Sequence, residues 1–141
     1  MENDIISSVE NFVRALDECN FDEALRFLSP RCRYLMNQTE LMGPKAILQS
    51  YAQNAKWAEE TLERVVYESD IEQKSANTFV VLYTDRIFHS GLEHTFRSRQ
   101  LLFVNNNGEI EQILHEDISG EQEALKEFFE RCGIQRSTDR G

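Results

Sequence analysis

Residues 79–118 constrain the fold of this chain more than any other stretch, because they predict three long, consecutive β-strands. The strands cover residues 79–89, 94–104 and 110–117, and they are rich in the β-branched and aromatic side chains that favour strands. Asn106, Asn107 and Gly108 separate the second strand from the third, and Asn and Gly accept the positive φ angles of a tight turn. The stretch therefore predicts an antiparallel meander against which the rest of the chain packs.

Helical patterns precede this meander. Apolar residues at helical spacing predict one helix over residues 5–19 and a second that starts after Asn20 and continues to Leu28, where Ser29-Pro30 stops it. Asn20 followed by Glu23 fits a capping box in its Asn variant. Gly43-Pro44 opens a third helix, because proline suits the first helical position.

The remaining segments complete a mixed pattern. Residues 31–41 have no clean period and are expected to be irregular, with room for a short strand at residues 33–36, and residues 62–71 predict another strand. A last helix begins at Ser119 or Gly120 and ends at Gly133, and residues 135–141 form a polar, frayed tail. We therefore expect one α+β domain over residues 1–141, with a core at about 5–134 and helices packed on one face of a curved antiparallel sheet.

Charge and composition exclude several classes of partner. The net charge is -10, with 15 Lys and Arg against 25 Asp and Glu, which disfavours nucleic acid and anionic membrane surfaces. The first ten residues resemble no secretory signal, and no apolar segment approaches membrane-spanning length, so we expect a cytoplasmic protein. The three cysteines are far apart and form no CxxC motif, which predicts reduced thiols. We expect no cofactor.

Side chains alternate between the two faces of each strand, and neither face of the meander is uniformly polar. Both faces are therefore expected to be at least partly covered. Helices cover one, and a second copy of the chain covers the other in a homodimer, since aromatic residues and Arg are enriched at interfaces. The alternative is a solvated outer face with scattered apolar residues.

Three stretches, VENFVRALDECNFDEALRFLSP, MGPKAILQSYAQ and LLFVNNNGEIEQILHEDI, together resemble the nuclear-transport-factor-2-like superfamily, specifically its SnoaL-like and ketosteroid-isomerase-like branch. The similarity covers residues 9–134. It implies a cone-shaped curved sheet wrapped around the N-terminal helices, with a C-terminal helix and a hydrophobic pocket between sheet and helices. These motifs are specific to the fold and not to one activity.

The resemblance also argues against two known reactions. The tyrosine and the two acidic residues of ketosteroid isomerases fall on Phe12, near Met36 and on Gln100, and Phe and Met can neither donate that hydrogen bond nor take a proton. A limonene-epoxide-hydrolase-like site needs an Asp-Arg-Asp cluster, and neither Arg97 nor Arg99 has an Asp two positions along its strand. The same comparison places both arginines on the outer face.

The pocket set that the resemblance implies contains a candidate acid/base group. His115 alternates with Asp117 on one strand, and Asp85 shares their face, so these three are the candidate catalytic residues of a polyketide cyclase or isomerase. The other hypothesis is a binding protein for a small apolar or aromatic molecule, without a reaction. The three histidines are too widely spaced for a local metal-ligand motif, and we expect no metal. The residues expected to contact a ligand are Phe12, Tyr34, Met36, Tyr51, Trp57, Tyr83, Phe96, Ser98, Gln100 and Ile113.

Overall fold

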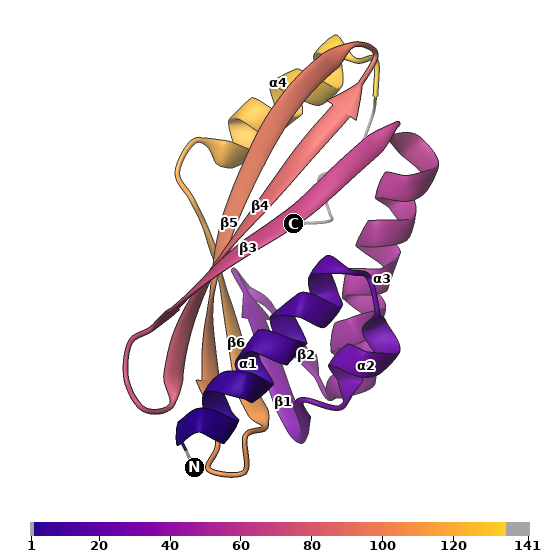
Figure 1. Ribbon diagram of the computed structural model, residues 1–141. Coiled ribbons are helices and arrows are strands. Elements are labelled where there is room, and N and C mark those ends of the chain that lie inside the picture. The colour runs from indigo at the N-terminus through magenta and orange to yellow at the C-terminus, as the bar shows by residue number, and fades with distance from the viewer. Residues whose placement is uncertain (1, 135–141) are drawn as a thin grey trace.

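The computed structural model describes residues 2–134, which form helices at both ends of the chain and one long sheet between them (Figure 1). The predicted tail at residues 135–141 lies outside the described residues. The elements in chain order are α1 (Glu2–Asp17), α2 (Phe21–Leu25), β1 (Leu28–Met36), β2 (Thr39–Met42), α3 (Pro44–Thr61), β3 (Arg64–Gln73), β4 (Thr78–His89), β5 (Leu92–Val104), β6 (Ile110–Asp117) and α4 (Glu121–Arg131).

The strands form one curved, open sheet in the order β2-β1-β6-β5-β4-β3 (Figure 1). The predicted meander is confirmed: β4, β5 and β6 are consecutive antiparallel neighbours, and β3 pairs with β4 over its full length. One pair departs from the expected antiparallel pattern, because β1 runs parallel to β6. That pair joins chain segments about 80 residues apart, as the separation of Tyr34 from its partner Ile113 illustrates.

The α+β fold is confirmed, with the N-terminal helices on the concave side of the sheet and α4 at its far end beside β5 (Figure 1). The stripe that predicted the first helix is buried, from Val9 and Phe12 at 0% exposure to Leu16 at 8%. The predicted cap of α2 is present, since the Asn20 side chain accepts a hydrogen bond from the backbone N-H of Glu23. Proline also opens α3, as predicted.

The prediction that the second helix continues to Leu28 is wrong. α2 ends at Leu25, whose side chain is 39% exposed, and the chain enters β1 at Leu28, which is buried beside Ile110. Pro30 lies inside β1, between Leu28 and Arg33, where the ladder to β6 is interrupted. Proline is tolerated there because its missing N-H removes no ladder hydrogen bond.

The short strand expected at residues 33–36 is confirmed as the end of β1, but the rest of residues 31–41 is not irregular, because β1 and β2 form a hairpin. Met36 pairs with Thr39 across the connection, and Asn37 takes a φ of 53° there. Asparagine is one of the few non-glycine residues that adopt this conformation readily. The hairpin carries Tyr34 and Met36 to the side of β6.

The turn between β5 and β6 is confirmed, with a different geometry from a two-residue turn. Only Gly108 of the turn residues has a positive φ, at 82°. The side chain of Asn105 organises the turn, because its Oδ1 accepts hydrogen bonds from the backbone N-H groups of Asn107 (2.9 Å) and Glu109 (3.0 Å). This arrangement fixes the register that brings β6 alongside β5.

The outer face of the sheet carries the charged residues that were expected there. Arg97 and Arg99 are exposed, and Arg99 pairs with Glu116 of β6 at 3.1 Å. Among residues 2–134, no helix has the length and apolar character needed to cross a membrane.

Candidate functional site

A cavity of about 1290 Å³ lies on the concave side of the sheet, between two clusters of buried side chains. The larger cluster joins α1 and the first half of α3 to the sheet, and Leu16 from it reaches the cavity wall. The smaller cluster joins the end of α3 to α4, and it contributes Leu62, Leu125 and Phe129. Because the two clusters pack at opposite ends of the molecule, the space between them stays open.

The pairing register arranges the inward side chains in rows that run across the strands. Successive rows are two positions apart along each strand. The rows are Val81, Gln100, His115 and Met36; Ser69, Tyr83, Ser98 and Asp117; and Tyr67, Asp85 and Phe96. The inner face predicted from the resemblance is therefore the concave face.

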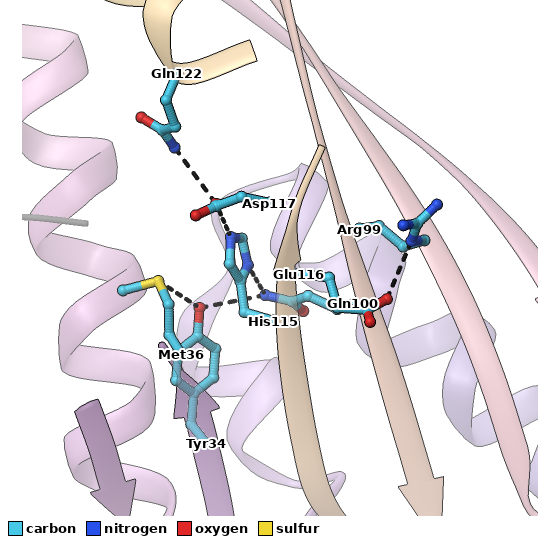
Figure 2. Close-up of polar contacts among 8 residues, drawn as sticks. All are labelled: Tyr34, Met36, Arg99, Gln100, His115, Glu116, Asp117 and Gln122. Carbon is cyan, nitrogen blue, oxygen red and sulfur yellow. Dashed lines mark hydrogen bonds and ion pairs between the residues drawn. The ribbon is translucent and has the colours of Figure 1, made fainter. Parts of the chain in front are cut away.

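Gln100 is at the centre of a hydrogen-bonded network on this face, and it is 3% exposed. Its Oε1 accepts from the Tyr51 hydroxyl at 3.1 Å, and its Nε2 donates to the Tyr34 hydroxyl at 3.4 Å. The same Nε2 lies 3.4 Å from Nδ1 of His115. Figure 2 shows the part of this network that runs from His115 through Gln100 to Tyr34, whose hydroxyl contacts the sulfur of Met36.

His115 is held at both ring nitrogens. Its Nε2 lies 3.1 Å from Oδ1 of Asp117, which also accepts from Gln122 of α4 at 3.5 Å (Figure 2). A carboxylate only accepts, so Nε2 carries the hydrogen of the neutral ring, and Nδ1 then faces the Gln100 amide as an acceptor. The predicted pair of His115 and Asp117 is present in the structure, and neither nitrogen of the imidazole is left over for a ligand in this arrangement.

The tyrosines of the network are neutral donors and acceptors. Burial raises the pKa of Tyr34 to about 12, against a smaller lowering by its hydrogen bond with Gln100. Burial likewise raises the pKa of Tyr51 well above its ordinary value. The Tyr34 ring packs edge-on against Tyr51 at 5.9 Å and stacks on His115 at 6.4 Å. Neither hydroxyl serves as a base near neutral pH.

Asp85, the third candidate catalytic residue, is separated from His115. It lines the cavity, yet it lies four residues along β4 from Val81, which is the residue level with Gln100 and His115. Four residues of strand correspond to about 13 Å. Asp85 therefore does not form an acid/base pair with His115.

Most of the residues expected to contact a ligand lie in the cavity wall. Phe12 and Ile113 do not: both are 0% exposed and belong to the larger core cluster, because they point between α1 and the sheet. Trp57 lies within α3, one turn before its end, and packs edge-on against Phe129 of α4 at 5.5 Å. The residues that line the cavity as expected are Tyr34, Met36, Tyr51, Trp57, Tyr83, Asp85, Phe96, Ser98, Gln100 and His115.

Many residues of the cavity wall were not anticipated from the sequence, among them Asp17 and Tyr67. The carboxylate of Asp17 accepts a hydrogen bond from the Ser69 hydroxyl at 2.5 Å. Burial raises the pKa of Asp17, the hydrogen bond from Ser69 opposes this rise, and the charges of Glu18 and Glu68 add to it. Tyr67 and Ser69 share a face because side chains alternate along β3. The pairing of β3 with β4 puts that face in the cavity wall, and the sequence did not reveal this register. Asp17 ends the first helix, and no local pattern shows that this end meets the sheet.

Neither metal chemistry nor thiol chemistry finds support in the described part of the chain. Residues 2–134 contain no group of three His, Cys, Asp or Glu side chains arranged to hold a metal ion. Cys19, Cys32 and Cys132 are free thiols. Burial raises the pKa of Cys32 to about 12, so this thiol stays protonated and unreactive.

No protein-family model matches the sequence, and no curated protein matches it. Solved structures do match. TerC co-crystallised with polyporic acid has a TM-score of 0.68 at 11% identity, covering 90% of this chain and 98% of that chain. An NTF2-like protein of unknown function from Burkholderia pseudomallei K96243 has a TM-score of 0.65 at 14% identity, covering 86% of this chain and 96% of that chain. A candidate polyketide cyclase from Xanthomonas campestris pv. campestris has a TM-score of 0.64 at 14% identity, covering 93% of this chain and 98% of that chain.

These structures confirm the fold that the sequence resemblance implied: the chain has the NTF2-like cone. Identities of this size establish a shared architecture and no shared activity.

Proposed function

We propose that this protein binds a small, largely apolar or aromatic molecule in the cavity of the cone. The observation that carries the proposal is the cavity itself, about 1290 Å³ of space walled by aromatic side chains such as Trp57, Phe96 and Phe129. Ligand sites are typically concave and mostly apolar, with a few polar groups that fix orientation. The network around Gln100 supplies such groups on one wall.

The test uses tetralin, a bicyclic hydrocarbon, as the probe. Trp57 is the only tryptophan of the chain and lines the cavity, so its fluorescence reports on occupancy, and calorimetry gives the affinity independently. Saturable binding at one site is expected, and Ser98→Trp, which fills the cavity, is expected to abolish it. Ser98→Ala adds no volume and serves as the matched control. Absence of saturable binding to the wild type, or unchanged binding in Ser98→Trp, contradicts the proposal.

A second candidate function, proton transfer by His115, is favoured by one observation, the 3.1 Å contact between the imidazole and Asp117. The contact between Nδ1 and the Gln100 amide opposes it, because an imidazole base needs that nitrogen free. Catalysis of the cyclase or isomerase class therefore requires the Gln100 side chain to move away from Nδ1 of His115 when substrate binds.

Exchange of the protons beside the carbonyl of 1-tetralone into D2O, followed by NMR, separates the two candidates. A binding protein leaves the exchange at the rate of buffer. A proton-transfer enzyme accelerates it, and His115→Ala then returns it to the buffer rate while the far-ultraviolet circular dichroism is unchanged. Accelerated exchange that survives in His115→Ala removes His115 from the mechanism.

We also propose that the protein is a homodimer through the outer face of the sheet. Val80, Leu101 and Leu114 are cross-strand neighbours on that face, and all three are half-buried. The adjacent row holds Leu82 opposite Arg99, which pairs with Glu116. Apolar side chains rimmed by charges are typical of association surfaces. Light scattering after size exclusion is expected to give twice the 16.5 kDa of the chain, and Leu101→Asp to give the monomer. A monomeric wild type refutes this interface.

A further inference from the structure

Tyr83 lines the cavity, and its buried hydroxyl has no hydrogen-bond partner among residues 2–134. The hydroxyls of Tyr34 and Tyr51 are both engaged by Gln100, whereas the Tyr83 oxygen is buried and unmatched. Buried polar atoms in native proteins almost always find a partner, and an unmatched one calls for an explanation. Tyr83 lines a ligand-sized cavity, and a molecule bound there would supply the missing partner.

The surroundings of Tyr83 define which ligand atom fits. Tyr83 is directly opposite Ser69 on β3 and Ser98 on β5, and Ser69 donates to the carboxylate of Asp17. Burial raises the pKa of the Tyr83 hydroxyl far above its ordinary value, and the charges of Asp17 and Asp85 raise it further. The group is therefore a neutral donor, and the nearby carboxylates repel an anionic acceptor.

We propose that Tyr83 is the specificity-determining residue of the cavity, donating a hydrogen bond from its hydroxyl to a neutral acceptor oxygen of the ligand, such as a ketone carbonyl. This inference rests on the proposed binding function and adds the chemical class of the ligand. Tyr83 lies two strands from His115 and two residues along, which separates their Cα atoms by about 12 Å. Both residues belong to the sheet wall of the cavity, whose volume of about 1290 Å³ has room for a fused bicyclic or tricyclic ketone.

The proposal predicts opposite effects of Tyr83→Phe on the free protein and on the complex. The hydroxyl has no protein partner, so its removal leaves the free protein equally stable or more stable. In the complex the same removal deprives the ligand oxygen of its donor. A merely structural tyrosine shows the reverse pattern, and Tyr51→Phe provides that matched control, because its hydroxyl donates to Gln100.

The experiment measures the affinities of tetralin, 1-tetralone and 1,2,3,4-tetrahydro-1-naphthoate by calorimetry, together with the midpoint of urea unfolding. These probes share one skeleton and differ in having no acceptor, a neutral acceptor and an anionic acceptor. For the wild type we expect 1-tetralone to bind most tightly. For Tyr83→Phe we expect its affinity to fall about five- to tenfold, with that of tetralin unchanged and the unfolding midpoint equal or higher.

The other outcomes overturn the inference in distinguishable ways. If Tyr83→Phe loses equal affinity for tetralin and 1-tetralone, Tyr83 contributes shape alone. If it loses affinity for neither, the hydroxyl makes no hydrogen bond to the ligand. Binding of the anionic probe as tight as that of 1-tetralone refutes the preference for a neutral oxygen. If neither neutral probe binds the wild type, the proposed function itself fails and the inference fails with it.

Discussion

Replacing Gln100 with leucine tests the network that organises the cavity wall. Leucine is close in size and apolar, so Gln100→Leu removes the amide without opening a large cavity. It deletes the hydrogen bonds to Tyr51 and Tyr34 and the contact with His115, and it leaves the Tyr51 hydroxyl buried without its partner. A neutral hydrogen bond contributes about 1 kcal/mol net, and an orphaned buried hydroxyl costs about 1–3 kcal/mol.

These contributions set the expected size of the effect. We expect Gln100→Leu to lower the free energy of unfolding by about 3 kcal/mol and Tyr51→Phe by about 1.5 kcal/mol. The double variant removes donor and acceptor together, so it is expected to cost about 3 kcal/mol and not the roughly 4.5 kcal/mol of independent sites. The difference, about 1.5 kcal/mol, is the coupling between the two side chains.

Urea unfolding followed by Trp57 fluorescence and circular dichroism measures all four proteins. Equal slopes against urea across the set allow the midpoints to be compared as free energies. The reasoning is refuted if the loss in the double variant equals the sum of the two single losses to within about 0.5 kcal/mol, which is the usual scatter for independent sites. So does a Gln100→Leu protein as stable as the wild type, since the amide then makes no net contribution.

Three further predictions follow from single side chains. Asn105→Ala removes the acceptor of two backbone N-H groups in the β5–β6 turn and is expected to cost about 1–2 kcal/mol in urea unfolding, whereas an unchanged midpoint contradicts this. Burial raises the pKa of Asp17 above 3.8, so the folded state loses stability as the pH rises through the folded pKa. Asp17→Asn is therefore expected to unfold at higher urea than the wild type at pH 7, with an advantage that shrinks toward pH 4; a constant advantage argues against it. Burial lowers the pKa of His94 below 6.5, with Glu121 opposing and Arg131 assisting, so stability falls as the pH drops below about 6.5. His94→Phe is expected to lose less stability than the wild type between pH 7.5 and pH 5, and parallel pH profiles count against this cause.

The sequence predicted the strands of the meander and their inner face correctly, for a local physical reason. Alternation along each strand fixes which side chains share a face, and the turn at Gly108 fixes how neighbouring strands pair. Tyr83, Gln100 and His115 are placed together by these two rules. The resemblance to a known superfamily then chose the concave side.

The errors arose where non-local contacts decided the outcome. A helical stripe through Leu25 and Leu28 predicted a helix, yet Leu28 gains more by burial beside Ile110 in a parallel ladder than in another half-turn of α2. The same ladder draws residues 31–41 into a hairpin. Parallel pairing of distant segments leaves no periodic trace in either one, so local patterns did not reveal it.

The candidate site divides in the same way. The proximity of His115 to Asp117 follows from their positions two residues apart on one strand. The separation of Asp85 from His115, the contact of Asp17 with Ser69 and the placement of Phe12 in the core depend on how whole elements meet. Side-chain chemistry alone does not separate the residues that share the site from those that do not. Their positions in the folded chain make that distinction.

What the sequence determined by itself is local: the helices, the strands, the alternation of faces and the supply of tyrosines, one histidine and carboxylates to the concave face. Periodicity encodes these features, because each depends on residues a few positions apart. The tertiary structure alone decided which hydroxyls are satisfied. Gln100 reaches Tyr51 and Tyr34 across 49 and 66 positions of sequence, and Tyr83, on the same wall, is left with an unmatched hydroxyl. Hydrogen bonding depends on distances in space, and those are fixed when α1, α3 and the sheet pack around the cavity.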